Sequence, residues 1–282
     1  MLERKFGFLE VRSSKVPEAT LHLHDRGYVL LRQVLAPEFA AELRLEIERI
    51  FSELPPDARP ATREAGDEDV YRYEMLNRSA ACQRAVGHPE LLEVIEPLLG
   101  SDCHVIANTA WRNPAGQNGT EEGQLWHIDA GPHVPRPQGT RWPDEIPYPV
   151  FAVGAHLLLR DSRIEDGPTG VIPGSHRSGQ HPPFESMRDA ALRYEENGCV
   201  PLLGQAGDVA LFVSDIWHRR MPPQAGEQGR FFLQVHYGRR DIAQRLRTSS
   251  QSNQLSKAAR SRAKTRRERT LIGMHDPQFY DG

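Results

Sequence analysis

One hexapeptide decides the fold class of this chain: Gln124-Leu125-Trp126-His127-Ile128-Asp129. If the segment is extended, His127 and Asp129 point to the same side, because side chains alternate along a strand. A second histidine, His218, follows far downstream, directly after a tryptophan. Two imidazoles and one carboxylate can bind one face of an octahedral ion and leave three positions open, as in non-haem Fe(II) oxygenases. We therefore predict that strands bring these three residues together around Fe(II).

The composition is that of an ordinary globular protein. A chain of 282 residues with 38% apolar residues can bury a sizeable core. Its three cysteines, Cys82, Cys103 and Cys199, are widely spaced and odd in number. That pattern fits a reducing cytosol better than a disulfide framework or a zinc site. The first residues lack the apolar core of a signal peptide, and no long apolar run could cross a membrane. We expect a soluble, cytoplasmic protein without a membrane partner.

Charge is unevenly distributed along the chain. Residues 239–269 carry eleven Lys and Arg against Asp241 and Glu268, whereas the whole chain has a formal net charge of −3. Such a segment could bind nucleic acid, but this one has no aromatic residue for base stacking. We expect a basic helical tail that packs on its own acidic domain. A nucleic-acid oxygenase guided by the tail is a less favoured alternative.

The N-terminal part, residues 20–100, is predicted to be mostly helical. Apolar residues at helical spacing predict helices over residues 37–51 and 88–99, the second ending at Gly100. A short strand is predicted over residues 27–31, before the first helix. The proline- and acid-rich residues 55–70 indicate a loop.

After Gly100 the pattern changes to short strands and Gly/Pro turns, which is typical of a sandwich or barrel. A long loop with six prolines is predicted over residues 131–149. We expect one domain over residues 1–282, with a jelly-roll core at 101–240 and a basic C-terminal extension at 241–282. The strands predicted for the core are residues 104–111, 151–159, 209–213 and 231–237.

An ordered set of motifs resembles the phytanoyl-CoA dioxygenase family over most of residues 20–240. The resemblance implies a mainly β protein with flanking helices, built on a double-stranded β-helix (jelly roll, cupin-like) core. It also implies Fe(II) with 2-oxoglutarate and O2 as cosubstrates, and His127, Asp129 and His218 as the metal ligands. The motifs are Gly27-Tyr28-Val29-Leu30-Leu31, Trp126-His127-Ile128-Asp129, Gly167-Pro168-Thr169-Gly170-Val171-Ile172-Pro173-Gly174-Ser175-His176, His218 and Arg230.

The same resemblance implies residues that hold 2-oxoglutarate. Arg230 lies twelve positions after His218, close to the family's interval for the arginine that pairs with the far carboxylate. A planar guanidinium suits a bidentate carboxylate contact. For Asn108 and Trp111, on the strand before the metal motif, core packing is about as good an explanation as a pocket role. The further residues expected at the keto acid or in its pocket are Gln124, Thr169, Asn108 and Trp111.

Two departures from the family's pattern stand out. The family often has serine two positions after the distal histidine, where this chain has Arg220, and often a lysine before the metal motif, where it has Arg112-Asn113-Pro114. We hypothesise that Arg220 faces the substrate and favours an anionic or polar one. Related halogenases carry a small residue in place of Asp129, so its presence indicates oxygenation.

The expected function is therefore that of an Fe(II)/2-oxoglutarate-dependent dioxygenase. It would hydroxylate, or otherwise oxidise, an unactivated C–H bond of a small-molecule metabolite and release succinate and CO2. The alternative is a catalytically silent jelly-roll binding protein that has kept the residues without turnover. We expect residues 131–149 and 55–75 at the mouth of the pocket. The ending, residues 272–282, is expected to dock on the body or on a partner chain, which leaves a homo-oligomer possible.

Overall fold

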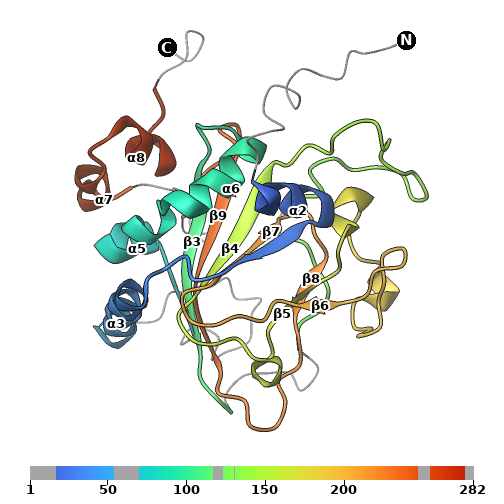
Figure 1. Ribbon diagram of the computed structural model, residues 1–282, viewed down its shortest axis with the longest axis horizontal. Helices are drawn as coiled ribbons and strands as arrows, with labels where there is room; N and C mark the ends of the chain where they lie inside the picture. The colour runs from blue at the N-terminus through green and yellow to red at the C-terminus, as the bar shows by residue number, and fades with distance from the viewer. Residues whose placement is uncertain (1–16, 54–69, 117–122, 130, 247–254, 277–282) are drawn as a thin grey trace.

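Two facing antiparallel sheets form the centre of the computed structural model, which describes residues 17–53, 70–116, 123–129, 131–246 and 255–276 (Figure 1). The larger sheet runs, in spatial order, β1 (Tyr28–Leu31), β7 (Val209–Val213), β4 (Ala152–Leu158), β9 (Arg230–Gly238), β3 (His104–Asn113) and β2 (Tyr71–Tyr73). The smaller sheet runs β6 (Val200–Pro201), β5 (Thr169–Val171) and β8 (His218–Arg220).

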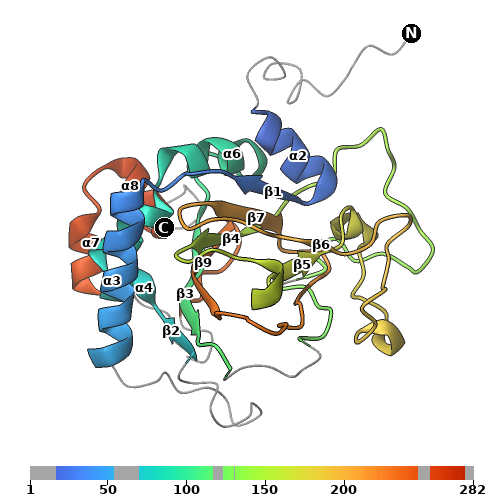
Figure 2. The ribbon, with the colours of Figure 1, turned by 60° about the horizontal axis from the view of Figure 1, so that its bottom comes forward.

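Helices cover the face of the larger sheet that is turned away from the smaller one (Figure 2). They pack on alternate residues of the strands: Val153, Ala155 and Leu157 of β4 share a buried core cluster with Leu43 and Ile47 of the first long helix. None of the described helices is long and apolar enough to cross a membrane. The helices are α2 (Glu18–Arg26), α3 (Pro37–Glu53), α4 (Met75–Arg78), α5 (Ala80–Val86), α6 (Pro89–Leu99), α7 (Lys257–Arg262) and α8 (Arg266–Leu271).

The elements predicted from longer sequence patterns are confirmed. The five predicted strands correspond to β1, β3, β4, β7 and β9, and the two predicted helices to α3 and α6. The two facing sheets confirm a mainly β, jelly-roll architecture with flanking helices. The structure adds β2, β5, β6 and β8, which have two or three residues each and are too short for an alternating pattern. Most of the predicted loop at residues 55–70 lies outside the described residues.

The basic C-terminal extension packs on the chain's own helices, as expected. Arg267 of α8 donates through Nε to Glu96 of α6 (2.8 Å), and Arg262 of α7 donates through Nε to the Gln83 side chain (2.7 Å). Leu271 and Ile272 are buried in the main core. The ending therefore docks on the body as far as residue 276, and residues 277–282 lie outside the described part.

Candidate active site

The metal motif is held in place by direct backbone pairing with β8. His127 and His218 exchange both of their backbone N–H···O bonds, each at 2.9 Å. Two residues on, the N–H of Asp129 donates to the carbonyl of Ser214 (3.2 Å). This extended geometry puts the side chains of His127 and Asp129 on one side, as the sequence predicts. It also sets the ring of His218 beside that of His127, with 4.3 Å between the ring centroids.

The three side chains could hold a metal ion. One ligand atom from each of His127, Asp129 and His218 lies within 4.8 Å of the others. The Nδ1 atom of His127 contacts the carbonyl of Leu125 (2.8 Å), and Nδ1 of His218 contacts that of Ile216 (2.9 Å). Because a carbonyl only accepts, both Nδ1 atoms carry the proton, and Nε2 is the ring nitrogen that each histidine can offer to an ion. The donor set and its orientation therefore fit Fe(II).

The electrostatics of the site also favour a bound cation. Burial disfavours the charged form of Asp129, but the imidazoles of His218 and His236 outweigh it and hold the pKa of this carboxyl far below its usual range. Burial likewise opposes the imidazolium of His218, yet the Asp129 carboxylate, 3.5 Å from Nε2, raises its pKa. The carboxylate is thus ionised, and its negative charge attracts a positive partner.

A cavity of about 530 Å³ opens over this cluster, between the two sheets. The triad lines it, and so do four of the five other residues predicted for the pocket. Two of these residues have defined contacts: the side-chain oxygen of Gln124 accepts from the N–H of Arg220 (3.3 Å), and Thr169 Oγ1 lies 3.4 Å from His156 Nδ1. The predicted residues that line the cavity are Gln124, Thr169, Trp111 and Arg230.

Asn108 is the predicted pocket residue that the structure leaves outside. It is buried, and its Nδ2 donates to the backbone carbonyl of Gln234 (3.0 Å). Ala107, Thr109 and Trp111 of the same strand line the cavity. Alternation along β3 therefore turns Asn108 to the opposite face, and a strand cannot present both Asn108 and Trp111 to one pocket.

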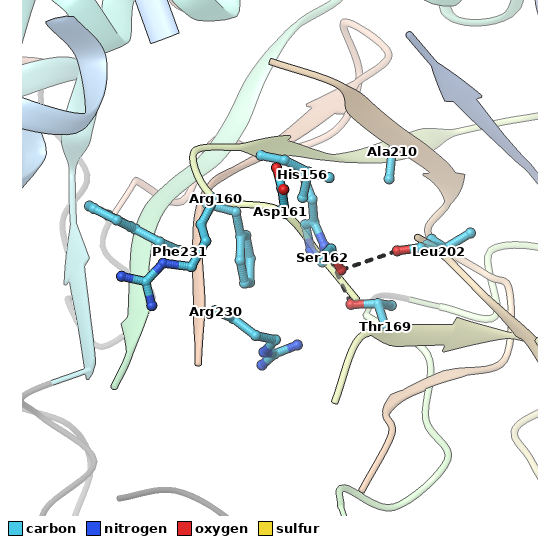
Figure 3. A pocket seen from close by; sticks show the side chains of 11 residues that line it. His156, Arg160, Asp161, Ser162, Thr169, Leu202, Ala210, Arg230 and Phe231 are labelled. Atoms are coloured by element: carbon cyan, nitrogen blue, oxygen red, sulfur yellow. Dashed lines mark hydrogen bonds between the residues drawn. The ribbon is translucent and has the colours of Figure 1, made fainter. Parts of the chain in front are cut away.

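Arg230 begins β9 and extends into the cavity beside His156 and Thr169 (Figure 3). Its NH2 group donates to the Asn113 side chain at 3.3 Å, and its guanidinium lies 5.3 Å from the centre of the Phe232 ring. Burial lowers the pKa of Arg230 well below its usual value. A small side cavity of about 20 Å³ adjoins the same guanidinium. The arrangement leaves a partly buried arginine facing the cavity.

Sequence reasoning missed several polar residues of the cavity wall, three of them on the central strands β4 and β9. His156 lies on β4, and Gln234 and His236 lie on β9. Trp111 Nε1 donates to the Gln234 side-chain oxygen (2.7 Å), Gln234 Nε2 lies 2.9 Å from His236 Nε2, and that atom lies 3.6 Å from the Asp129 carboxylate. The signal was present, because each of the three interrupts a strand that is otherwise mostly apolar.

The prediction that residues 131–149 form the mouth of this pocket is wrong. Arg141, Trp142 and Tyr148 from that segment line a separate cavity of about 520 Å³, and none of its residues lines the cavity above the triad. The segment contains no helix or strand, as predicted. Of residues 55–75, Tyr73 lines the main cavity, while residues 55–69 lie outside the described part.

Comparison with known protein families identifies the family of this chain. The family model described as phytanoyl-CoA dioxygenase matches residues 23–221, which is most of the chain and includes the whole triad. The chain belongs to the phytanoyl-CoA dioxygenase family. Membership confirms the resemblance read from the motifs. The expected class of enzyme is confirmed with it, a non-haem dioxygenase that depends on Fe(II) and 2-oxoglutarate.

Individual relatives are dioxygenases. The chain is 26% identical to an ectoine dioxygenase of Nocardia farcinica over 230 residues, 72% of each chain. It is 21% identical to the dioxygenase cdmD of Talaromyces verruculosus, over 73% of this chain and 68% of that protein.

Solved structures share the fold. The apo form of EctD from S. alaskensis superposes with a TM-score of 0.61 at 22% identity, covering 78% of this chain and 76% of that one. The epimerase SnoN, solved with Fe3+, alpha ketoglutarate and nogalamycin RO, gives a TM-score of 0.59 at 20% identity over 80% and 84% of the two chains.

Proposed function

We propose that this family member oxidises a C–H bond of a small-molecule metabolite, with hydroxylation as the default outcome. In this proposal His127, Asp129 and His218 hold Fe(II), and Arg230 holds 2-oxoglutarate. The observation that carries it is the convergence of the three ligand atoms within 4.8 Å in the wall of a cavity of about 530 Å³. That volume suits a keto acid together with a small second molecule.

The triad residues have different tasks in this proposal. The backbone carbonyls behind His127 and His218 fix both rings, so that neither histidine must reorient when the metal binds. Asp129 supplies the negative charge that favours a divalent ion. When bound, Fe(II) and the keto acid activate O2 for the oxidation of a C–H bond, with release of succinate and CO2.

Arg230 sets the position of the keto acid. Its partly buried side chain lines the cavity and is suited to the carboxylate that remains when the other end of the keto acid chelates the metal. Thr169 and Gln124 are proposed to add neutral polar contacts, because both line the same space. Trp111 is proposed to act indirectly, because the hydrogen bond from its indole fixes the orientation of the Gln234 amide in the cavity wall.

The substrate is proposed to be a small polar metabolite. Tyr73 and Trp111 offer flat surfaces, and Thr109 and Gln234 offer hydrogen bonds. Ectoine, the compound named for the relatives, is the first compound to test. Among the described residues no acidic residue other than Asp129 lines the cavity, and Asp129 is assigned to the metal, so a cationic substrate group would find no further carboxylate there.

Succinate formation tests the proposed function. The purified protein is supplied with Fe(II), 2-oxoglutarate and O2, with and without ectoine, and succinate is quantified. Wild type should form succinate, and Asp129→Ala should lose at least about 100-fold in rate, since the metal loses its only anionic ligand.

Asp241→Ala is the matched control, because this carboxylate is exposed, pairs with Arg239 and does not line the cavity. It should behave as wild type. Well-folded, iron-loaded wild type that forms no succinate with any of a panel of metabolites would favour the binding-protein alternative. Equal rates in Asp129→Ala and wild type would contradict the assignment of the site.

A further inference from the structure

The cavity is also lined by a second arginine, Arg220, besides the partly buried Arg230. Arg220 lies two residues after His218 on β8, so its side chain is on the same side of the strand. It is only 7% exposed and lines the cavity together with Arg230. Across the small sheet Arg220 pairs directly with Thr169, whose hydroxyl is turned towards His156. Arg220, Thr169 and Arg230 therefore surround one part of the cavity.

The two positive charges lack matching negative charges. Within the described residues neither guanidinium forms an ion pair, and the Nε atoms of Arg220 and Arg230 are both buried without a hydrogen-bond partner. The carboxylate that acts on Arg220 is Glu227, whose two oxygens already accept from the N–H groups of Gly116 (2.5 Å) and Gly229 (2.7 Å). Burial is the larger cause of the lowered pKa of Arg230, and the neighbouring charge of Arg220 lowers that pKa further.

Two like charges in the wall of one cavity destabilise each other, and an anion bound between them relieves this. The geometry of the donors points the same way. An ionised carboxylate has two oxygens with about four lone-pair sites, enough for two guanidinium groups. A cavity wall lined by two arginine side chains and a threonine is therefore complementary to a carboxylate.

We propose that Arg220 and Arg230 together clamp the distal carboxylate of 2-oxoglutarate, which makes Arg220 a second cosubstrate-binding residue. The inference rests on the proposed function of the site. It replaces the hypothesis that Arg220 contacts the substrate, because Arg220 pairs with Thr169, and Thr169 and Arg230 line the same part of the cavity. Where the family often has serine, this chain has a charged donor, so the site should discriminate strongly between keto acids with and without a second carboxylate.

Calorimetric titration of the Ni(II)-loaded protein tests the clamp without turnover. Two keto acids are compared: 2-oxoglutarate, and 2-oxobutanoate, which chelates the metal in the same way but lacks the distal carboxylate. Arg220→Ala should weaken the affinity for 2-oxoglutarate by about 10- to 100-fold, the range for a charged hydrogen bond. The affinity for 2-oxobutanoate should change by less than about two-fold. Arg220→Lys keeps the charge without the planar fork, so its affinity for 2-oxoglutarate should lie between those of wild type and Arg220→Ala.

Arg260→Ala is the matched control, because Arg260 is an exposed arginine that does not line the cavity. It should bind both keto acids as wild type does. The clamp is overturned if Arg220→Ala and Arg220→Lys bind 2-oxoglutarate like wild type, which is also the result expected if Arg220 serves only the substrate. It is equally overturned if both keto acids weaken in parallel, because that result describes a damaged metal site. Wild type that binds Ni(II) but neither keto acid would contradict the proposed function itself.

Discussion

Asp208 shows how a single carboxylate can hold two turns of this fold. It is 1% exposed and accepts hydrogen bonds from the backbone N–H of Gln33 (2.8 Å) and of Gln205 (2.9 Å), and Arg32 pairs with it at 2.9 Å. These contacts join the segment after β1 to the turn before β7. Burial favours the neutral form, but these donors outweigh it and lower the pKa of Asp208.

The Asp208→Asn substitution should therefore destabilise the protein in a pH-dependent way. At pH 7 we expect the free energy of unfolding to fall by about 2–3 kcal/mol, because buried N–H groups lose a charged acceptor. Because its pKa is lower in the folded state, the carboxylate stabilises the folded protein above its unfolded pKa of about 3.9. This stabilisation is lost as the pH falls through the folded pKa. Urea denaturation at pH 7 and pH 3 measures the difference between variant and wild type. It should shrink at pH 3, and a constant or growing difference would contradict the assignment.

At the scale of elements, the C-terminal helices are fixed to the body by specific arginines. Arg267 donates to Glu96 (2.8 Å), to the carbonyl of Cys103 (2.9 Å) and to its sulfur (3.3 Å), so α8 is joined to both α6 and the start of β3. The adjacent Arg266 is 81% exposed and pairs with Asp276 within the same extension. The two neighbours thus differ in what they connect.

Arg267→Ala should lower the free energy of unfolding by about 1–2 kcal/mol, since its three hydrogen bonds to Glu96 and Cys103 are lost. Arg266→Ala is the matched control and should change stability little, as exposed ion pairs contribute little. Thermal and urea denaturation of the two variants supply the comparison. Equal losses in both would mean that the extension is held by its apolar residues alone.

Strand alternation explains both the success and the failure of sequence reasoning at the site. The His-x-Asp spacing placed His127 and Asp129 on one side, and the same rule, applied to the strand before it, would have excluded Asn108. His236 interrupts an apolar strand, but the sequence does not show which side of the sheet its side chain will face. β5 and β8 have three residues each, too few for any periodic signal, so the neighbourhood of Thr169 and Arg220 emerges only from the folded sheet.

At the scale of the whole molecule, all three predicted parts of the chain contribute to one cavity. Tyr73 comes from the N-terminal part, the triad from the jelly-roll core, and Ile242 and Arg245 from the basic extension. This shared wall favours the proposal of a single domain. The same extension uses part of its charge internally, which favours packing on the body over the nucleic-acid alternative.

The central claim is that the triad and Arg230 form one site for Fe(II) and 2-oxoglutarate. Anaerobic titration of the Fe(II)-loaded protein with 2-oxoglutarate, followed by the visible metal-to-ligand charge-transfer band, tests it most directly. Wild type should develop the band. Asp129→Ala should give a weaker band or none, and Arg230→Ala should need more keto acid to reach the same intensity. No band in well-folded, iron-loaded wild type, or identical titrations in all three proteins, would contradict the account.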